Sequence, residues 1–223
     1  MKKALFGLAA SLAAVFLAGF FIPLEGAWLD GPVSAYLSQK LHTGIRVKSP
    51  KITRWSVLSF QSLALTDPAG AEWATSGPGR ARRAFSRVTI HLTDLALAPK
   101  IAQRFAMLSS VLPDGGRGLF EAREILAIVV ERKKATTVHV PRWVSDKFVL
   151  KGGVRFAGRR AVKAHALLLF PSGFLDGLPG EVRSRLKVRP DGFGEFRLTF
   201  LENKLILEGA SGPLLKAQWQ APS

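Results

Sequence analysis

From Gly44 onward, apolar and polar residues alternate with a period of two in most segments. The runs "GIRVK" (44–48), "RVTIHLTDLAL" (87–97) and "GEFRLTF" (194–200) place apolar side chains at every second position. Because successive side chains of a strand point to opposite faces, this pattern predicts strands with one apolar face. The sequences "DPAG" (67–70) and "DG" (191–192) between such runs predict tight turns.

Other stretches depart from simple alternation. The runs "ILAIVV" (125–130) and "AHALLLF" (164–170) are apolar at both parities, which favours strands covered on both faces. Apolar residues recur at helical spacing in 28–43 and again in 101–112, each followed by glycine or proline. We therefore expect a mainly β fold of about ten strands, an antiparallel meandering sheet shaped as an open taco or a jelly roll, with one or two short helices.

The first residues predict a membrane anchor. Residues 4–24 carry no charge and are long enough to cross a bilayer core. Lys2 and Lys3 precede this run, and the next cation is Lys40, so the positive-inside rule places the amino terminus in the cytoplasm. A cleaved signal peptide is the alternative reading. The side chains expected to anchor the chain are Leu5, Leu8, Leu12, Phe16, Phe20 and Ile22.

This orientation divides the chain into three parts. We expect residues 1–27 to form the anchor of a single-pass membrane protein. Residues 28–43 are expected to form a juxtamembrane helix, with Trp28 and Tyr36 at interfacial depth, and 44–223 a β-rich domain across the membrane from the cytoplasm.

Charge adds a second constraint. The chain has 32 Lys and Arg against 16 Asp and Glu, a net charge of +16, which predicts attraction to an anionic surface. In "EVRSRLKVRP" (181–190) cations alternate with mainly apolar residues, as in a strand with one cationic face. The cations of this face are Arg183, Arg185, Lys187 and Arg189. We expect them either to face water as an ordinary solvated strand face or to dock anionic headgroups or a protein partner. The segment "GPGRARR" (77–83) is expected to be a flexible basic loop.

The sequence carries no pattern typical of catalysis. It has no cysteine, and the four histidines, His42, His91, His139 and His165, lack partners at a metal-ligand spacing. Phosphate-loop and nucleophile-elbow motifs are also absent from the sequence. We therefore expect neither an enzyme nor a metal or cofactor site.

Several predicted strands have apolar residues at both parities, and few helices are expected to cover them. This pattern indicates a groove for acyl chains, and an ordinary core is the alternative. Basic residues at its rim would suit phosphate-bearing headgroups. The groove candidates are Ile125, Ile128, Val130, Val182, Leu186, Val188, Phe196, Leu198 and Phe200.

The segments 4–24, "HTGIRV" (42–47), "LSFQSLALTDPAG" (58–70) and "RVTIHLTDLAL" (87–97) resemble the amino-terminal region of AsmA-like proteins, a group of bridge-like lipid carriers of the bacterial inner membrane. The carboxy-terminal half is similar in style to type II secretion system protein N and to LptC-like lipopolysaccharide export proteins. These resemblances imply a bacterial inner-membrane location with one span and with the β-rich domain 44–223 in the periplasm. The first and third resemblances imply lipid handover, and the second implies a structural part of a secretion machine.

Two functions follow as hypotheses. The leading one is a tethered envelope protein that binds or hands over lipid or lipopolysaccharide. The alternative is an assembly component of a secretion or pilus apparatus, with envelope proteins as partners. Nucleic acid is not expected as a partner, because an exported domain does not normally meet it.

Overall fold

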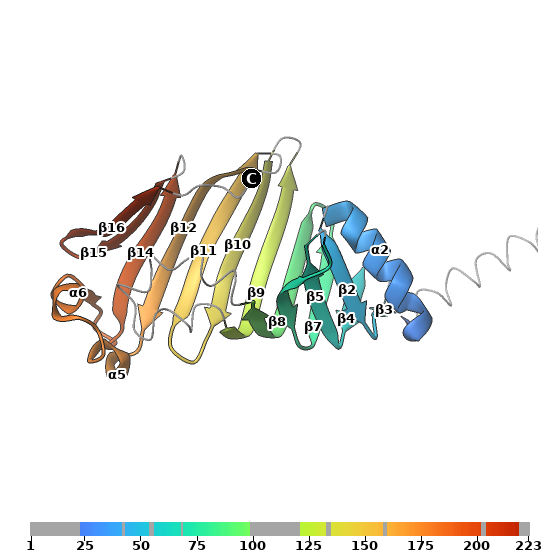
Figure 1. Cartoon of the computed structure of the whole chain (residues 1–223), viewed down its shortest axis with the longest axis horizontal. Coiled ribbons are helices and arrows are strands. Elements are labelled where there is room, and N and C mark those ends of the chain that lie inside the picture. The colour runs from blue at the N-terminus through green and yellow to red at the C-terminus, as the bar shows by residue number, and fades with distance from the viewer. Residues whose placement is uncertain are drawn as a thin grey trace, which may run out of the picture.

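Antiparallel strands form one continuous open sheet (Figure 1). The computed structural model describes residues 23–41, 43–53, 56–67, 69–98, 121–132, 135–157, 160–201 and 204–218. Every strand pairing among these residues is antiparallel, and neighbours in the sheet mostly follow one another along the chain. The expectation of a mainly β, antiparallel sheet with few short helices is therefore confirmed.

The elements are bounded as follows. The strands are β1 (Leu24–Glu25), β2 (Gly44–Lys48), β3 (Lys51–Thr53), β4 (Val57–Phe60), β5 (Ser62–Thr66), β6 (Glu72–Ser76), β7 (Gly79–Ala84), β8 (Arg87–Leu97), β9 (Glu121–Arg132), β10 (Ala135–Val144), β11 (Val149–Ala157), β12 (Arg160–Phe170), β13 (Lys187–Val188), β14 (Gly194–Leu201), β15 (Lys204–Gly209) and β16 (Gly212–Gln218). The described helices are the 3-10 helix η1 (Ala27–Leu29) and the α-helices α2 (Asp30–Leu41), α5 (Ser172–Leu175) and α6 (Gly180–Ser184).

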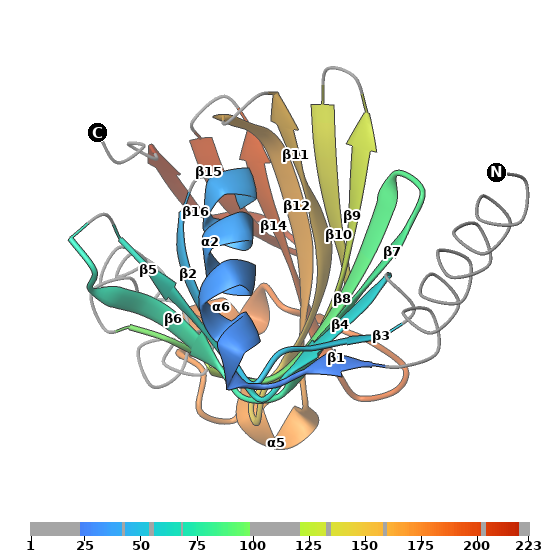
Figure 2. The ribbon, with the colours of Figure 1, turned by 90° about the vertical axis from the view of Figure 1, so that its right-hand side faces the viewer.

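The amino-terminal strands bend at a common level. β2 runs into β3, β4 into β5 and β6 into β7, and β8 changes its partner from β7 to β6 along its length. Ser49 and Asp94 turn the chain at this level with φ values of 51° and 50°, which non-glycine residues adopt infrequently. The bend folds this end of the sheet around α2 (Figure 2). We call this line the crease, and its residues are Ser49, Gln61, Gly77 and Asp94.

Helix α2 also covers the free edge of β2. The side chains at three positions spaced four apart accept hydrogen bonds from backbone N–H groups spaced two apart. This match is geometric, because four helical residues rise about 6 Å and two strand residues about 6.6 Å. An edge strand protected in this way cannot pair with another chain. The bonds of this helix–strand ladder run from Ile45 N to Ser38 Oγ (2.8 Å), Val47 N to Ser34 Oγ (2.9 Å) and Ser49 N to Asp30 Oδ1 (3.1 Å).

Both predicted turns are confirmed. Gly70 N donates to Asp67 O at 2.9 Å, and Gly70 has a φ of 85° that suits glycine. Gly192 N donates to Arg189 O at 3.0 Å with a φ of 81°, and this turn joins β13 to β14.

Two expectations about basic segments are wrong. Residues 181–190 do not form one strand: Gly180–Ser184 is α6, and only Lys187–Val188 pairs in the sheet. The two buried apolar residues of this segment, Val182 and Leu186, are four positions apart. This spacing puts both on one side of a helical turn, and it would also put both on one face of a strand. Residues 79–84 are not a loop but β7, because pairing with β4 and β8 on both sides overrides the local Gly and Arg composition.

The predicted anchor at 4–24 lies almost wholly outside the described residues, as does the helix predicted at 101–112. Within the described part of the chain, no helix combines the length and the hydropathy needed to span a bilayer. The helix expected within 28–43 is present as α2.

Candidate functional site

The face of the sheet that holds α2 carries three rows of side chains that run across the strands. Except at the register shift of β10 beside Val140, the residues of each row lie opposite one another in successive pairings, so their side chains share one face. The row nearest α5 and α6 is the most deeply buried, with Phe196 fully inaccessible and Leu168 at 3% exposure. This deep row consists of Leu92, Ile125, Trp143, Leu150, Leu168 and Phe196.

The other two rows are apolar along their whole length, yet each of their residues is only partly buried. We call these rows the apolar lane. They contain no polar side chain, so acyl chains could lie across them without desolvating a polar group. The first row is Val88, Val129, Val138, Val154, Ala164 and Phe200, and the second is Ile90, Ala127, Val140, Gly152, Ala166 and Leu198.

The described helices contact the two ends of this face. At one end, Val33 and Leu37 of α2 pack against Ile45, Val47 and Phe60. At the other end, α5 and α6 cover the deep row, where their side chains join a cluster with rings 5.7 to 5.8 Å apart. The residues that α5, α6 and their flanking turns contribute are Leu175, Leu178, Val182 and Leu186.

Trp143 connects the clusters of the deep row. It packs against the α5–α6 cluster and against the cluster of Leu95, Ala122 and Ile125. Its indole Nε1 is buried, and within the described part of the chain it has no hydrogen-bond partner. A buried donor without an acceptor costs about 1–3 kcal/mol, so the ring stays at this site because of its apolar contacts.

The opposite face of the sheet is basic. Its residues alternate with those of the lane along each strand and include few carboxylates, of which Glu124 and Glu195 lie near Arg142 and Arg197 at 3.0 and 3.5 Å. The two faces therefore differ sharply in chemistry. The cations of this basic face are Arg80, Arg82, Arg87, Arg142, Lys151, Arg155, Lys163, Arg197, Lys204 and Lys216.

The structure separates the predicted groove residues. Leu198 and Phe200 lie in the lane, and Ile125 and Phe196 lie in the buried deep row. Ile128 and Val130 project from the basic face, so the run 125–130 is not covered on both sides as expected. Val182 and Leu186 are buried in the α5–α6 cluster, and Val188 is 61% exposed in β13.

The four predicted docking cations do not form one row. Arg183 pairs with Asp176 at 2.9 Å, and Arg189 pairs with Asp191 at 3.2 Å. Arg185 and Lys187 are exposed, the first at the end of α6 and the second in β13. Their cations therefore spread around the α5–α6 end instead of lining one strand face.

Sequence reasoning missed most of the lane. Only two of its residues were among the candidates, although "TTVHV" and "RVTIH" show the apolar parity of Val138, Val140, Val88 and Ile90. The signal was therefore present within each strand. The missing information was which parity of one strand shares a face with which parity of the next.

Comparisons with known proteins do not extend this description. No protein-family model matches the chain, and no curated protein or solved structure matches it significantly.

Proposed function

We propose that the chain is a tethered envelope protein whose sheet binds a lipid or lipopolysaccharide along the apolar lane and hands it over. The observation that carries the proposal is the lane itself, two complete cross-strand rows with apolar and only partly buried side chains. A soluble protein rarely exposes a contiguous apolar patch of this kind unless it binds an apolar partner.

The dimensions of the lane support acyl chains as the ligand. It spans β8, β9, β10, β11, β12 and β14, so five inter-strand steps of about 4.8 Å give a length of about 24 Å. One leaflet of a bilayer core is about 15 Å thick, half of about 30 Å. An acyl chain lying across the strands would therefore fit within the lane.

A cation stands at one end of the lane. Arg83 lies directly opposite Val88, where β7 continues the first row. Its side chain is exposed, and its Nε donates to the carbonyl oxygen of Phe85 at 3.4 Å. A phosphate headgroup at this end would meet a guanidinium, which is a strong phosphate partner.

Tethering completes the proposal. The uncharged run 4–24 and the lysines before it favour an inner-membrane anchor with the sheet in the periplasm. An apolar lane held close to the bilayer would receive lipid directly from the membrane. The short path would reduce the exposure of acyl chains to water, and therefore the hydrophobic cost of the transfer.

Native mass spectrometry of the full-length chain, extracted gently from membranes, tests this function. We expect the parent protein to retain stoichiometric phospholipid or lipopolysaccharide. Val138→Glu places a charge in the lane and should abolish this adduct. Thr137→Glu, one residue earlier on the basic face, is the matched control and should keep it.

Circular dichroism should show that both variants fold. Retention of the lipid by Val138→Glu would contradict the proposed lane. A lipid-free parent protein that carries a defined protein partner would instead favour the secretion-apparatus alternative.

A further inference from the structure

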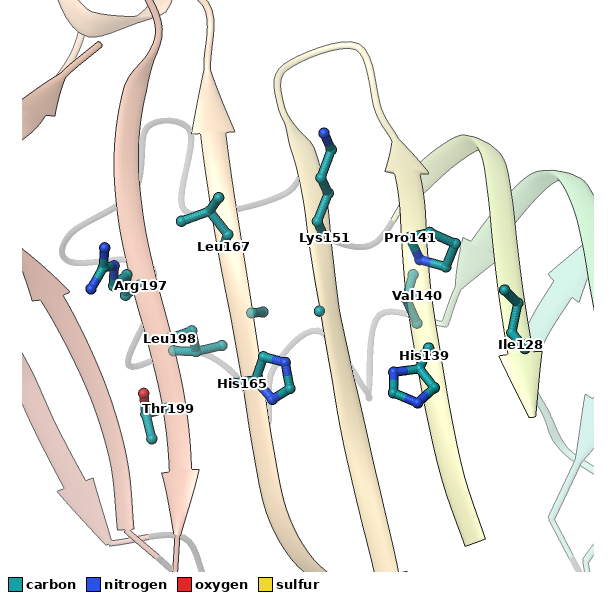
Figure 3. Close-up of a pocket in the computed structure, with 12 residues that line it drawn as sticks. Ile128, His139, Val140, Pro141, Lys151, His165, Leu167, Arg197, Leu198 and Thr199 are labelled. Carbon is teal, nitrogen blue, oxygen red and sulfur yellow. The ribbon is translucent and has the colours of Figure 1, made fainter. Parts of the chain in front are cut away.

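The basic face holds a cleft of its own, opposite the apolar lane (Figure 3). The cleft crosses β10, β11, β12 and β14 and has a volume of about 550 Å³. Its floor is backbone, because the residues there direct their side chains to the lane. These floor residues are Val140, Gly152, Ala166 and Leu198, and the walls carry Ile128, His139, His165 and Thr199 on one side and Pro141, Lys151, Leu167 and Arg197 on the other.

Two imidazoles lie in one wall of the cleft, on either side of β11 (Figure 3). His139 and His165 lie opposite Gly153 from either side, in the strands that flank it. A Cβ atom at Gly153 would be 3.5 Å from His139 Nδ1 and 3.4 Å from His165 Cε1. Both rings therefore lean over the glycine, which has no side chain to separate them. Thr199 lies opposite His165 and adds a hydroxyl group to the same wall.

The charges around the cleft are positive. Lys151 lies two residues before Gly153, and Arg155 lies two residues after it on the same face. No carboxylate among the described residues pairs with Lys151 or Arg155 at ion-pair distance, whereas Arg197 lies 3.5 Å from Glu195. A ligand in the cleft would therefore meet imidazole, ammonium and hydroxyl donors with little competition from acids.

This charge decides between two ligand classes. Paired imidazoles could bind a transition metal, but no group of three metal-ligating residues occurs among the described residues, and the flanking cations would repel a divalent ion. A phosphate group has the opposite requirement, since it takes several charge-assisted hydrogen bonds and favours a positive surround.

We propose that this cleft binds a phosphate group, with His139, His165 and Thr199 as its donors (Figure 3). Lys151, in the opposite wall, and Arg155 supply the positive charge around it. Leu167 and Ile128 give the cleft apolar contacts for the remainder of a phosphate ester. The phosphate could belong to a soluble ester or to a lipid headgroup, and both would use the same donors. The site is separate from the lane and does not depend on acyl-chain binding there.

The test measures phosphate binding by the full-length protein in a non-ionic detergent. Isothermal titration with inorganic phosphate and with glycerol 3-phosphate is compared for the parent protein and for the double variant His139→Ala, His165→Ala, which removes both side-chain donors. We expect saturable binding that the double variant weakens about tenfold or more, since the phosphate loses a hydrogen bond from each imidazole. The matched control is His91→Ala; His91 is an exposed histidine of the same face that lies 3.0 Å from Glu124 and outside the cleft.

A second arm identifies the source of the phosphate. Mixed micelles of the same detergent and phosphatidylcholine, with and without phosphatidic acid, are added to the same three proteins. Binding that requires phosphatidic acid and is lost in the double variant assigns the cleft to a headgroup. A double variant that binds all probes like the parent protein overturns the proposal. The lane variant Val138→Glu should keep phosphate binding, so a failure of this site and a failure of the lane give different results.

Discussion

The helix–strand ladder makes a quantitative prediction about the amino-terminal edge of the sheet. In the double variant Ser34→Ala, Ser38→Ala, the backbone N–H groups of Val47 and Ile45 lose their acceptors. Each unpaired donor costs about 1–3 kcal/mol, and because these bonds are only partly buried we take about 1–2 kcal/mol each. Alanine is the better helix former by about 0.5 kcal/mol per site, which offsets part of the loss. The net expected loss of unfolding free energy is therefore about 1–3 kcal/mol.

Urea unfolding measures this loss, and amide hydrogen exchange locates it. The amides of Ile45 and Val47 should exchange faster in the double variant, while amides in β11 and β12 should change only as far as global stability falls. Ala35→Ser, on an exposed position of α2, is the matched control because it measures helix propensity without the ladder. A double variant as stable as the parent, with unchanged protection at Ile45 and Val47, would refute the reasoning.

Three further predictions concern the core and the strand spacing. In urea unfolding, Trp143→Phe should change the free energy of unfolding by less than about 1 kcal/mol, because it removes an unpaired donor and keeps an aromatic ring. Trp143→Ala should lower it by about 3–5 kcal/mol. Equal losses would contradict the conclusion that apolar contacts hold the ring in place. Gly152→Ala should lower the free energy of unfolding by about 2–3 kcal/mol, because the added Cβ would lie 2.4 Å from the backbone oxygen of His165. Gly153→Ala should lower it clearly less, and thermal unfolding of the two variants checks this order. Leu186→Asp should unfold the α5–α6 end, which would be seen as a loss of near-ultraviolet circular dichroism, because Leu186 is buried. Arg185 is exposed, so the free energy of unfolding of Arg185→Glu should stay within about 0.5 kcal/mol of the parent value. Equal losses would contradict the buried position of Leu186 and the exposed position of Arg185.

Much of the strand content could be predicted from the sequence because it depends on local alternation and on turn residues. The turns at 67–70 and 191–192 contain residues whose own conformational preferences fix the chain, so they were found correctly. The crease could not be predicted, because it depends on positive φ values at Ser49 and Asp94, which non-glycine residues adopt infrequently.

The candidate site was harder to predict for a related reason. Alternation shows that Val138 and Thr137 face opposite ways, but only the register shows that Val138 lies opposite Val154. Irregular pairings in β10 and β11 also shift the register partway along these strands. After such a shift, alternate positions that shared a face with those of the neighbouring strand no longer do so. The segment 181–190 failed for a different reason, since two apolar residues four apart satisfy a strand and a helical turn equally.

The crease has a mechanical consequence. Backbone hydrogen bonds continue through it, from Gln61 N to Lys48 O at 3.1 Å and from Gly77 N to Thr93 O at 2.9 Å, so bending there would break paired bonds. The two parts of the sheet that the crease joins should therefore keep a fixed angle around α2, and the crease should not act as a hinge. A cargo of varying width would have to be accommodated by the strands beyond β8, namely β9 to β12, which do not contain the crease residues.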